Sequence, residues 1–326
     1  MKTLVIGATG FIGSAITRHL VDEGGEVRIA VRSGSDTRGL DDLDVERVGA
    51  DLRDIDSLRT ALRGCDRLFL TAALFSHWAR DVDAFYEVNV TGTRHALQAA
   101  LEADVSKIVY TSTNNAIGAY GPTAVDEEVV FNYWNTGDHY SISKYLGEVE
   151  ATRFAARGLA VVIVNPTLVV GPGDRRPTSS GQLVLEVAGG KLPVYTQGWV
   201  NVVDVDDVAA GHLLAAERGR VGERYLLGGT NLTVKEYFGL IAEAAGRRPP
   251  RVRLPYRTAV ALAHGFEAVS RFTKRHPTAT VSEVKIGRLG EWYNSDKAQR
   301  ELDFTARPAA EAIQRSVTWF KDEGYL

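Results

Sequence analysis

The sequence predicts an α/β protein with a doubly wound parallel sheet and a smaller α/β region at its C-terminal end. Short β-branched runs alternate with helical stretches from residue 2 to about residue 165, which is the pattern of consecutive βαβ units. The run Val161–Asn165 is apolar up to its last residue, as in strands that are buried on both faces. We therefore divide the chain into a domain at 1–170 and a second region at 171–326, some of whose segments can return to the first sheet.

The same alternation places the individual elements. Strands are expected at Thr3–Ile6, Val27–Val31, Val45–Val48, Arg67–Leu70, Lys107–Thr111 and Val161–Asn165, and the first helix begins near Gly10. The stretch GPGDRRPTSSG after residue 170 indicates a loop that leads into the second region. Helices are expected there at Leu183–Ala188, Val205–Glu217, Val234–Ala245, Thr258–Phe272, Ser295–Leu302 and Ala309–Glu323, with short strands between them.

Composition narrows the possible functions. A formal charge of −3 over 326 residues gives no basic field for a nucleic acid, so no nucleic acid partner is expected. Cys65 is the only cysteine, which excludes an intrachain disulfide and a cysteine metal cluster and fits a cytoplasmic protein. The N-terminus lacks the features of a secretory signal, and no apolar run is long enough for a membrane span. We expect a small-molecule substrate and no metal.

The first motif follows the first strand and reads GATGFIG. Glycine allows a tight turn and a close approach of backbone N–H groups to a pyrophosphate at a helix N-terminus, which is the requirement of a Rossmann dinucleotide site. An ordinary strand-to-helix turn is the alternative, but the strand and helix on either side both match the motif. The cofactor contacts expected in this loop are Gly7, Thr9, Gly10, Phe11, Ile12 and Gly13.

The end of the second strand bears on which nicotinamide cofactor is used. NAD-selective proteins place a carboxylate there for the ribose 2′-hydroxyl, whereas this chain has Val31 followed by Arg32. A guanidinium at this place would attract a 2′-phosphate, so we predict NADP(H), with NAD(H) as the alternative cofactor. The alternative role of Arg32 is that of a solvated arginine on the surface. Asp51, after the third strand, either reaches the adenine amino group or caps the following helix.

The motif that carries chemistry is YSISK, with Tyr140 and Lys144 four residues apart at the start of a helix. Residues at this spacing share a helix face, and a neighbouring ammonium favours the phenolate of a tyrosine whose ordinary pKa is about 10. Ser112 and Thr113 follow the strand Lys107–Thr111, at the carboxyl edge of the sheet where such folds bind ligands. A Ser/Thr turn that closes the strand is their alternative role.

With these motifs the chain resembles the extended short-chain dehydrogenases/reductases of the NAD-dependent epimerase/dehydratase type. The resemblance extends along nearly the whole length: GATGFIG, the Asp51 turn, Ala72-Ala73, NVTGT at Asn89–Thr93, TST at 111–113, YSISK and VDDVA at Val205–Ala209. The segments VVIVNPTLVVGPGD and NLTVKEYFGLIAEAAGR are most similar to dihydroflavonol-4-reductase-like members and to hopanoid-associated sugar epimerases.

The resemblance implies a role for each matching residue. Tyr140 is the acid/base, Lys144 binds the nicotinamide ribose and lowers the tyrosine pKa, and Thr113, five residues before Gly118, supplies the active-site hydroxyl. Asn89 holds the active-site backbone and a relay water. The cofactor would also contact Leu52, Ala72, Ala73, Ser112, Pro166, Thr167 and Leu168. A homodimer is implied through the helices Phe85–Glu102 and Tyr140–Arg157, with Leu97, Leu101, Leu146 and Val149 as candidates for an apolar surface.

One departure from the family bears on the substrate. Many sugar-nucleotide members carry an arginine that grips the diphosphate, and the aligned residue here is Val200. We therefore predict reduction of a ketone or aldehyde, or oxidation of the secondary alcohol, of a fairly apolar molecule. The alternatives are a sugar-nucleotide epimerase or dehydratase that retains its cofactor, with Arg175 and Arg176 replacing the missing arginine, and a catalytically silent redox sensor.

The substrate pocket is the least constrained prediction. Aromatic and other large side chains near the expected active site suggest an apolar pocket, although packing of the domain junction explains them equally well. The candidates are Phe75, His77, Trp78, Tyr133, Trp134 and Leu168, together with Thr113.

Overall fold

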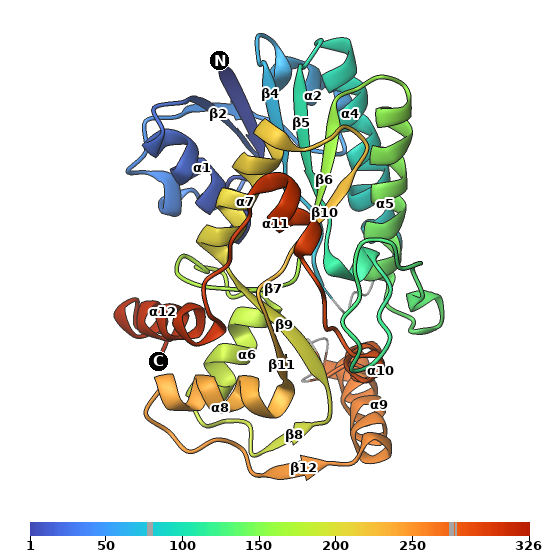
Figure 1. The fold of residues 1–326 in the computed structure, drawn as a ribbon, viewed down its shortest axis with the longest axis vertical. Coiled ribbons are helices and arrows are strands. Elements are labelled where there is room, and N and C mark those ends of the chain that lie inside the picture. The colour runs from blue at the N-terminus through green and yellow to red at the C-terminus, as the bar shows by residue number, and fades with distance from the viewer. Residues whose placement is uncertain (77–80, 274–276, 278) are drawn as a thin grey trace.

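A seven-stranded parallel sheet dominates the upper part of the molecule in Figure 1, and a smaller helical and β region lies below it. The computed structural model describes residues 1–76, 81–273, 277 and 279–326. The strand order is β10-β6-β5-β4-β1-β2-β3. The predicted doubly wound α/β fold is confirmed.

The strands of this sheet agree closely with those expected from the sequence, except that the last of them, β10, was not expected. They are β1 Lys2–Ile6, β2 Glu26–Val31, β3 Glu46–Gly49, β4 Arg67–Leu70, β5 Lys107–Thr111, β6 Val161–Pro166 and β10 Arg224–Leu227. The chain winds outward from β1 to β3 and then crosses back to β4, so the winding direction reverses between β1 and β4. Such a reversal opens a crevice at the carboxyl ends of the strands, and ligands bind in that crevice.

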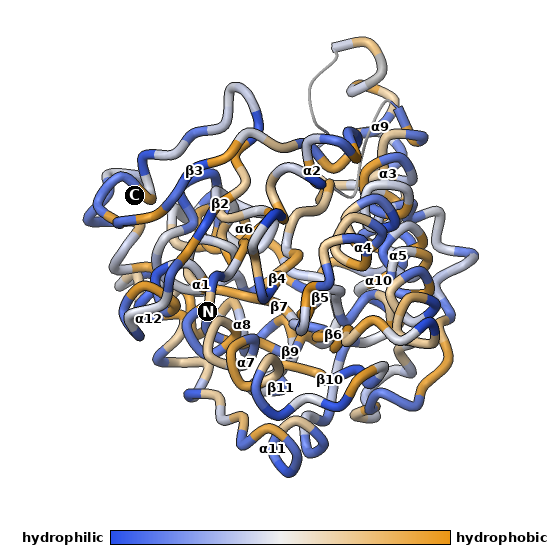
Figure 2. The backbone as a smooth tube through the Cα atoms, turned by 90° about the horizontal axis from the view of Figure 1, so that it is seen from above, coloured by the Kyte–Doolittle hydropathy of each residue, from blue (hydrophilic) through white to orange (hydrophobic). Residues whose placement is uncertain are grey.

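Both faces of the sheet are covered by helices because successive strand residues point to opposite sides. Val5 packs into one hydrophobic cluster with helices α1 (Phe11–Asp22) and α7 (Val205–Arg218), and Leu4 packs into the other. That second cluster includes side chains of α2 (Ile55–Leu62), α4 (Thr93–Glu102) and α5 (His139–Ala156). Figure 2 accordingly shows apolar strands at the centre of the molecule and hydrophilic loops around them.

The second region is built on two small sheets. One has the order β11-β9-β7, and the other pairs β12 with β8. Helices α6, α8 and α12 share a hydrophobic core with the first of these sheets. The elements of the region are β7 Leu168–Val170, α6 Ser179–Ala188, β8 Val194–Thr196, β9 Trp199–Asp204, β11 Thr230–Thr233, α8 Val234–Ala244, β12 Val252–Leu254, α9 Tyr256–Thr273, α10 Val281–Leu289 and α12 Ala309–Asp322. Helix α11 (Asp296–Leu302) packs instead with α7 and β10 at the large sheet.

Three differences from the sequence expectations concern elements. Helix α10 was not expected, although a capping box of Thr280 and Glu283 opens it. The helix expected at Phe85–Glu102 consists of α3 (Asp83–Tyr86), a π-helical segment η2 (Glu87–Gly92) and α4, and η2 carries Asn89. Strand β10 and helix α7 lie beyond residue 170 in the sequence but pack with the large sheet, while the division at 170 itself stays a prediction. Short 3-10 turns complete the fold: η1 Arg38–Leu40, η3 Asn114–Ala116 and η4 Tyr133–Asn135.

Candidate active site

The glycine loop joins β1 to α1 and is built for close backbone contacts. Gly7 has a φ of +99°, in the region that favours glycine, and its carbonyl accepts a hydrogen bond from the N–H of Gly10 at 2.9 Å. A Cβ on Gly13 would collide with that same carbonyl oxygen, so Gly13 lets α1 approach the loop. This glycine cradle leaves room for a phosphate at the N-terminus of α1, which fits a dinucleotide.

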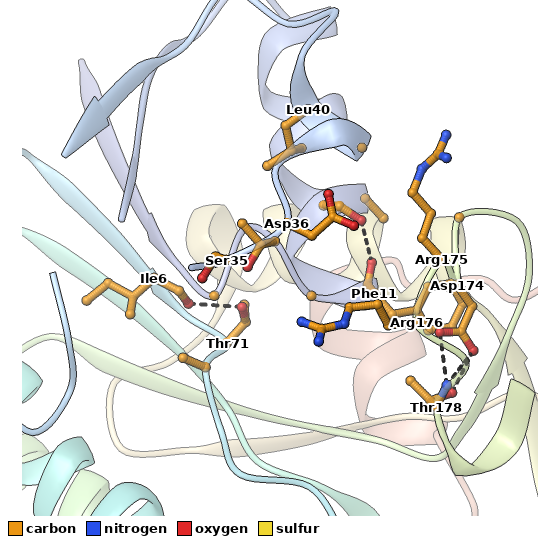
Figure 3. A pocket seen from close by; sticks show the side chains of 18 of the residues that line it. Ile6, Phe11, Ser35, Asp36, Leu40, Thr71, Asp174, Arg175, Arg176 and Thr178 are labelled. Atoms are coloured by element: carbon orange, nitrogen blue, oxygen red, sulfur yellow. Dashed lines mark hydrogen bonds between the residues drawn. The ribbon is translucent and has the colours of Figure 1, made fainter. Parts of the chain in front are cut away.

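A cavity of about 740 Å³ opens beside this loop (Figure 3). Arg32 and Asp51 line it at the ends of β2 and β3, and Ala72 and Ala73 line it after β4. Its walls thus include nine of the residues predicted to contact the cofactor: Gly7, Thr9, Gly10, Phe11, Arg32, Asp51, Leu52, Ala72 and Ala73. Residues that the prediction names but that do not line this cavity are Ile12, Gly13, Ser112, Tyr140, Lys144, Pro166, Thr167 and Leu168.

The structure excludes one of the two roles considered for Asp51, that of a helix cap, and its contact with the adenine stays a prediction. Asp54, and not Asp51, caps α2, because its side chain accepts from the backbone N–H groups of Asp56 and Ser57. Asp51 instead accepts two hydrogen bonds from the guanidinium of Arg53, at 2.7 and 3.1 Å. These bonds hold the pKa of Asp51 at about 2, so its carboxylate stays ionised in the cavity wall.

The opposite wall of the cavity comes from residues that the sequence analysis did not assign to the cofactor. The five consecutive residues of the loop Pro172–Arg176 line this wall, and Trp319 of α12 completes it. Arg175 pairs with Glu323 at 3.1 Å, whereas Arg176 extends toward Ser35 and Asp36 across the cavity (Figure 3). The Gly and Arg residues of this loop are a sequence signal from which its place at the cavity could have been predicted. No feature of the sequence around Trp319 indicates that this residue lines the cavity.

Asp174 anchors the loop that carries the two arginines. Its carboxylate accepts hydrogen bonds from the N–H of Thr178 at 2.9 Å and from the hydroxyl of Thr178 at 2.8 Å. Burial raises the pKa of Asp174 to about 6, although the bonds from Thr178 oppose that shift. The position of Arg176 therefore depends on a buried carboxylate two residues away.

Tyr140 and Thr113 meet at the carboxyl edge of the sheet. Tyr140 lies in the first turn of α5, whose N-cap Asp138 accepts from the N–H of Ser141 at 3.1 Å. Burial raises the pKa of Tyr140 above its ordinary value, and the nearby hydroxyl of Thr113 lowers it in part. The hydroxyl of Thr113 also accepts from the N–H of Asn115 at 3.3 Å. Thr113 therefore both closes the end of the strand and lies near the phenol.

Lys144 lies buried one helical turn further along α5. Its ammonium donates to the carbonyl oxygen of Thr111 at 2.7 Å and to the hydroxyl of Tyr110 at 3.2 Å. Burial lowers the pKa of Lys144 to about 8. We expected this ammonium to lower the pKa of Tyr140, but here it is directed at β5, and the hydroxyl of Thr113 is the group that lowers it.

Two polar side chains hold the surrounding backbone. The amide of Asn89 donates to the carbonyl of Leu74 at 3.0 Å and to the hydroxyl of Ser143 at 2.9 Å, and its oxygen accepts from the N–H of Leu74 at 2.8 Å. Asn89 thus ties the segment after β4 to α5. Asn165 of β6 donates to the carbonyl of Thr113 at 2.9 Å and to Glu148 at 2.8 Å.

Ser112 provides a second test of whether a cofactor fits. Its hydroxyl is buried and has no hydrogen-bond partner within the described part of the chain. A buried hydroxyl without a partner is costly, and a polar group of a bound ligand would satisfy it. The glycine cradle and this hydroxyl both fit a dinucleotide that runs from the glycine loop to the end of β5.

The predicted substrate residues fall into different environments. The ring of Phe75 meets the ring of Tyr140 edge-on, with centroids 4.7 Å apart. Tyr133 is fully buried and packs against Phe131, and Trp134 is half exposed and packs against Phe131 and Tyr145, so the packing alternative describes both. His77 and Trp78 lie outside the described residues.

The segment after β6 and the strand β9 contain the remaining positions. Thr167 donates to the side-chain oxygen of Asn201 at 2.8 Å, between Pro166 at the end of β6 and Leu168 at the start of β7. Val200 is buried and belongs to the hydrophobic core of the second region. The residue that aligns with the diphosphate arginine of sugar-nucleotide relatives is therefore a buried, apolar one.

Comparison with known proteins identifies the family. The sequence model of the NAD dependent epimerase/dehydratase family matches residues 3–228. A Synechocystis protein named as a dihydroflavonol 4-reductase is 36% identical over 99% of this chain and 95% of its own. Sterol demethylase protein B of Methylococcus capsulatus is 35% identical over 100% of both chains. Cinnamoyl-CoA reductase 1 of Petunia hybrida is 29% identical over 99% of this chain and 92% of its own.

The solved structures agree with these relatives. The structure of PA4631, a nucleoside-diphosphate-sugar epimerase from Pseudomonas aeruginosa, has a TM-score of 0.83 and 28% sequence identity, and the match covers 100% of this chain and 99% of that one. Fold, cofactor cleft and sequence therefore lead to the same conclusion. The chain is an NAD(P)-dependent oxidoreductase that belongs to the NAD dependent epimerase/dehydratase family, the extended short-chain dehydrogenases/reductases.

Proposed function

We propose that this protein is an NADP(H)-dependent reductase that reduces the ketone or aldehyde of a fairly apolar small molecule, or oxidises the corresponding secondary alcohol. The observation that carries the proposal is that the buried phenol of Tyr140 lies near the hydroxyl of Thr113 at the carboxyl edge of the sheet. A phenol and a hydroxyl held together there can both bind one carbonyl oxygen. A redox sensor would have no use for this arrangement.

The protein residues would divide the work as follows. The bound nicotinamide supplies or accepts the hydride. Tyr140 donates the proton to the carbonyl oxygen, Thr113 orients that oxygen, and Lys144 holds the nicotinamide ribose. Because burial raises the pKa of Tyr140, its phenol remains protonated at neutral pH and suits the role of an acid in the reducing direction. Asn89 is a positioning residue, since its bonds hold Leu74 and Ser143 in place.

Two arginines support a preference for NADP(H). Arg32 lines the cavity at the end of β2, where no carboxylate competes for the ribose 2′-hydroxyl. Arg176 lines the same cavity from the other wall. The nearby Asp36 is engaged by Arg38, which donates to it at 2.6 and 2.9 Å, so its negative charge is already paired.

An apolar substrate without a nucleotide diphosphate agrees with the buried Val200 and with the names of two relatives, which refer to dihydroflavonol and a sterol. The alternative is a sugar-nucleotide epimerase or dehydratase with a retained cofactor. It is favoured by the name of PA4631 and by the arginines at 175 and 176. Both arginines, however, lie on the wall of the cavity that faces the glycine loop.

A single assay separates the two candidates. The purified protein is mixed with NADPH and a panel of aryl and alkyl ketones and aldehydes, or with uridine- and deoxythymidine-diphosphate sugars. Loss of nicotinamide absorbance that depends on an added carbonyl compound is expected. Epimerised or dehydrated sugar nucleotide without net oxidation of the cofactor, together with cofactor retained through purification, would instead establish the alternative.

We also propose a cytoplasmic homodimer. The helices η2–α4 and α5 would pair with their counterparts across a two-fold axis. Leu146 and Val149 remain accessible on α5, but Leu97 is fully buried in the chain's own core and cannot serve a partner. The reduced, buried Cys65 agrees with a cytoplasmic location.

A further inference from the structure

Helix α9 presents large apolar side chains to the surroundings of the molecule. It packs against α10, and three of its small residues are buried, namely Ala259, Ala263 and Ser270. The side chains of Val269 and Phe272 are 58% and 88% exposed. Exposed large apolar residues that cluster mark a surface that binds something. Four of them lie on this helix: Leu262, Phe266, Val269 and Phe272.

These four residues form one stripe and are not scattered. Their spacings of four, three and three residues keep them on one face of a helix, along a length of about 15 Å. The buried alanines occupy a neighbouring face of the helix. The helix is therefore amphipathic in an unusual sense, since its small residues face the protein and its large apolar residues face outward.

The sequence that contains this stripe is rich in basic residues. Residues 247–276 contain eight arginines and lysines and one acid, Glu267, in a protein whose formal charge is −3. The carboxylate of Glu267 accepts the N–H of Val281 at 2.8 Å. The exposed arginines of this stretch precede the stripe and lie between the end of α8 and the first turn of α9: Arg247, Arg248, Arg251, Arg253 and Arg257.

The stripe and the arginines share one end of the molecule. Figure 1 shows that the chain runs from α8 through β12 into α9 along the end opposite to the large sheet. A second copy of this surface would bring like charges together, which opposes self-association. An anionic phospholipid surface offers apolar chains for the stripe and negative head groups for the arginines.

We propose that α9 and the preceding arginine-rich segment dock this end of the protein onto the surface of an anionic phospholipid bilayer. No helix in the described residues is long and apolar enough to cross a membrane, so the contact is interfacial. This inference goes beyond the proposed reductase activity and does not depend on it. For an apolar substrate, docking would place the enzyme where the substrate is concentrated.

The docking end is connected to the reaction site. Helix α10, which packs against α9, is followed by Glu291, whose carboxylate accepts from the side-chain amide of Asn114 at 3.3 Å. Asn114 is the neighbour of Thr113, and the hydroxyl of Thr113 donates to its side-chain oxygen at 3.2 Å. A bilayer at α9 would thus be linked to the proposed catalytic hydroxyl through three contacts.

The test uses the full chain and sedimentation with large vesicles of phosphatidylcholine, with or without phosphatidylglycerol. Binding is expected only with the anionic lipid, and added salt should weaken it. The variant with Phe266→Glu and Phe272→Glu should lose at least tenfold in apparent affinity. The matched control, Val130→Glu with Val221→Glu, alters two equally exposed apolar residues elsewhere and should bind like the parent.

A second pair of variants tests the charge. The substitutions Arg248→Gln and Arg251→Gln should each reduce the affinity for anionic vesicles about fivefold. The control substitutions Arg63→Gln and Arg300→Gln, at exposed arginines elsewhere, should leave the affinity unchanged. Equal binding to neutral vesicles, or none to anionic ones, overturns the proposal. It is also overturned if Phe266→Glu changes only the oligomeric mass in sedimentation velocity, because that result assigns the stripe to a second copy. Turnover of a water-soluble ketone should be unchanged in all four variants, so failure of docking leaves the reductase proposal intact.

Discussion

The phenol of Tyr140 is the side chain on which the proposed chemistry depends most directly. Replacing it by phenylalanine removes the proton donor and keeps the ring that meets Phe75. We expect kcat to fall roughly 10²–10⁴-fold while the dissociation constant of NADPH stays nearly unchanged, since general acid groups contribute about that much. Steady-state rates and a fluorescence titration measure the two quantities. Tyr145→Phe, on the same helix, is the control, and a loss under about tenfold would remove Tyr140 from the acid role.

Lys144 is expected to act on both binding and rate. Its ammonium donates to Thr111 and Tyr110 at the end of β5, beside the unpartnered hydroxyl of Ser112. The change Lys144→Met keeps the length of the chain and removes these donors. We expect weaker NADPH binding and a lower kcat together, measured by the same titration and assay. Unchanged binding would restrict the residue to a structural role at the strand end.

Arg32 should decide which nicotinamide cofactor is preferred. A charge-assisted hydrogen bond to a 2′-phosphate is worth about 1.5–3 kcal/mol, which corresponds to roughly 10- to 100-fold in affinity. Arg32→Ala should weaken NADPH binding by that factor and leave NADH binding nearly unchanged. Arg63→Ala is the control for loss of a surface cation. If the parent protein binds both cofactors equally, the predicted preference is wrong.

At the level of whole elements, the sequence predicted best where local signals and the fold agree. The strands of the large sheet were predictable because β-branched runs end at turn residues, and β5 and β4 were placed residue for residue. The loop Pro172–Arg176 was located but its role was not, because its contact with the glycine loop joins segments more than 150 residues apart. The same holds for Trp319, since no local pattern encodes a contact made only in the folded chain.

Helix α7 supplies a pH-sensitive support for β5. The imidazole of His212 donates through Nδ1 to the carbonyl of Val208 at 2.7 Å, and its Nε2 lies 2.9 Å from the hydroxyl of Thr111, which can donate to a neutral imidazole. Burial lowers its pKa from 6.5 to about 4. The unfolded chain therefore takes up this proton at a higher pH than the folded chain, and stability falls as the pH drops from about 6.5 to about 4.

The contribution of His212 to the pH dependence of stability can be measured by comparing the parent protein with a variant that lacks this histidine. We expect the parent protein to lose on the order of 2–3 kcal/mol between these pH values through His212 alone. Because Asp174 titrates in the opposite sense, the quantity to follow is the difference in unfolding free energy between the parent and His212→Gln. That difference should shrink in acid. His264→Gln, on the exposed side of α9, is the control, and a difference independent of pH would contradict the assignment.

The assembly of the whole molecule gives a further prediction. Val149 is exposed on α5, close to the ion pairs that Glu150 makes with Arg94 and Arg153 at 3.0 and 2.9 Å. If α5 forms the dimer interface, Val149→Glu places an unpaired charge in it and should shift the protein from dimer to monomer at micromolar concentration. Sedimentation velocity measures this shift, with Val221→Glu as the control. A parent protein that is already monomeric would reject the dimer.

The position of β10 at the edge of the large sheet has a consequence for how the chain is made. Residues 224–227 pair with β6, yet β6 leaves the ribosome about sixty residues earlier, with the second region's first strands and helices in between. Until β10 emerges, the apolar edge of β6 stays open for pairing with other nascent chains. A fragment that stops at residue 170 would expose this edge permanently. Such a fragment should aggregate during translation, while a chain extended through β10 should remain in the supernatant.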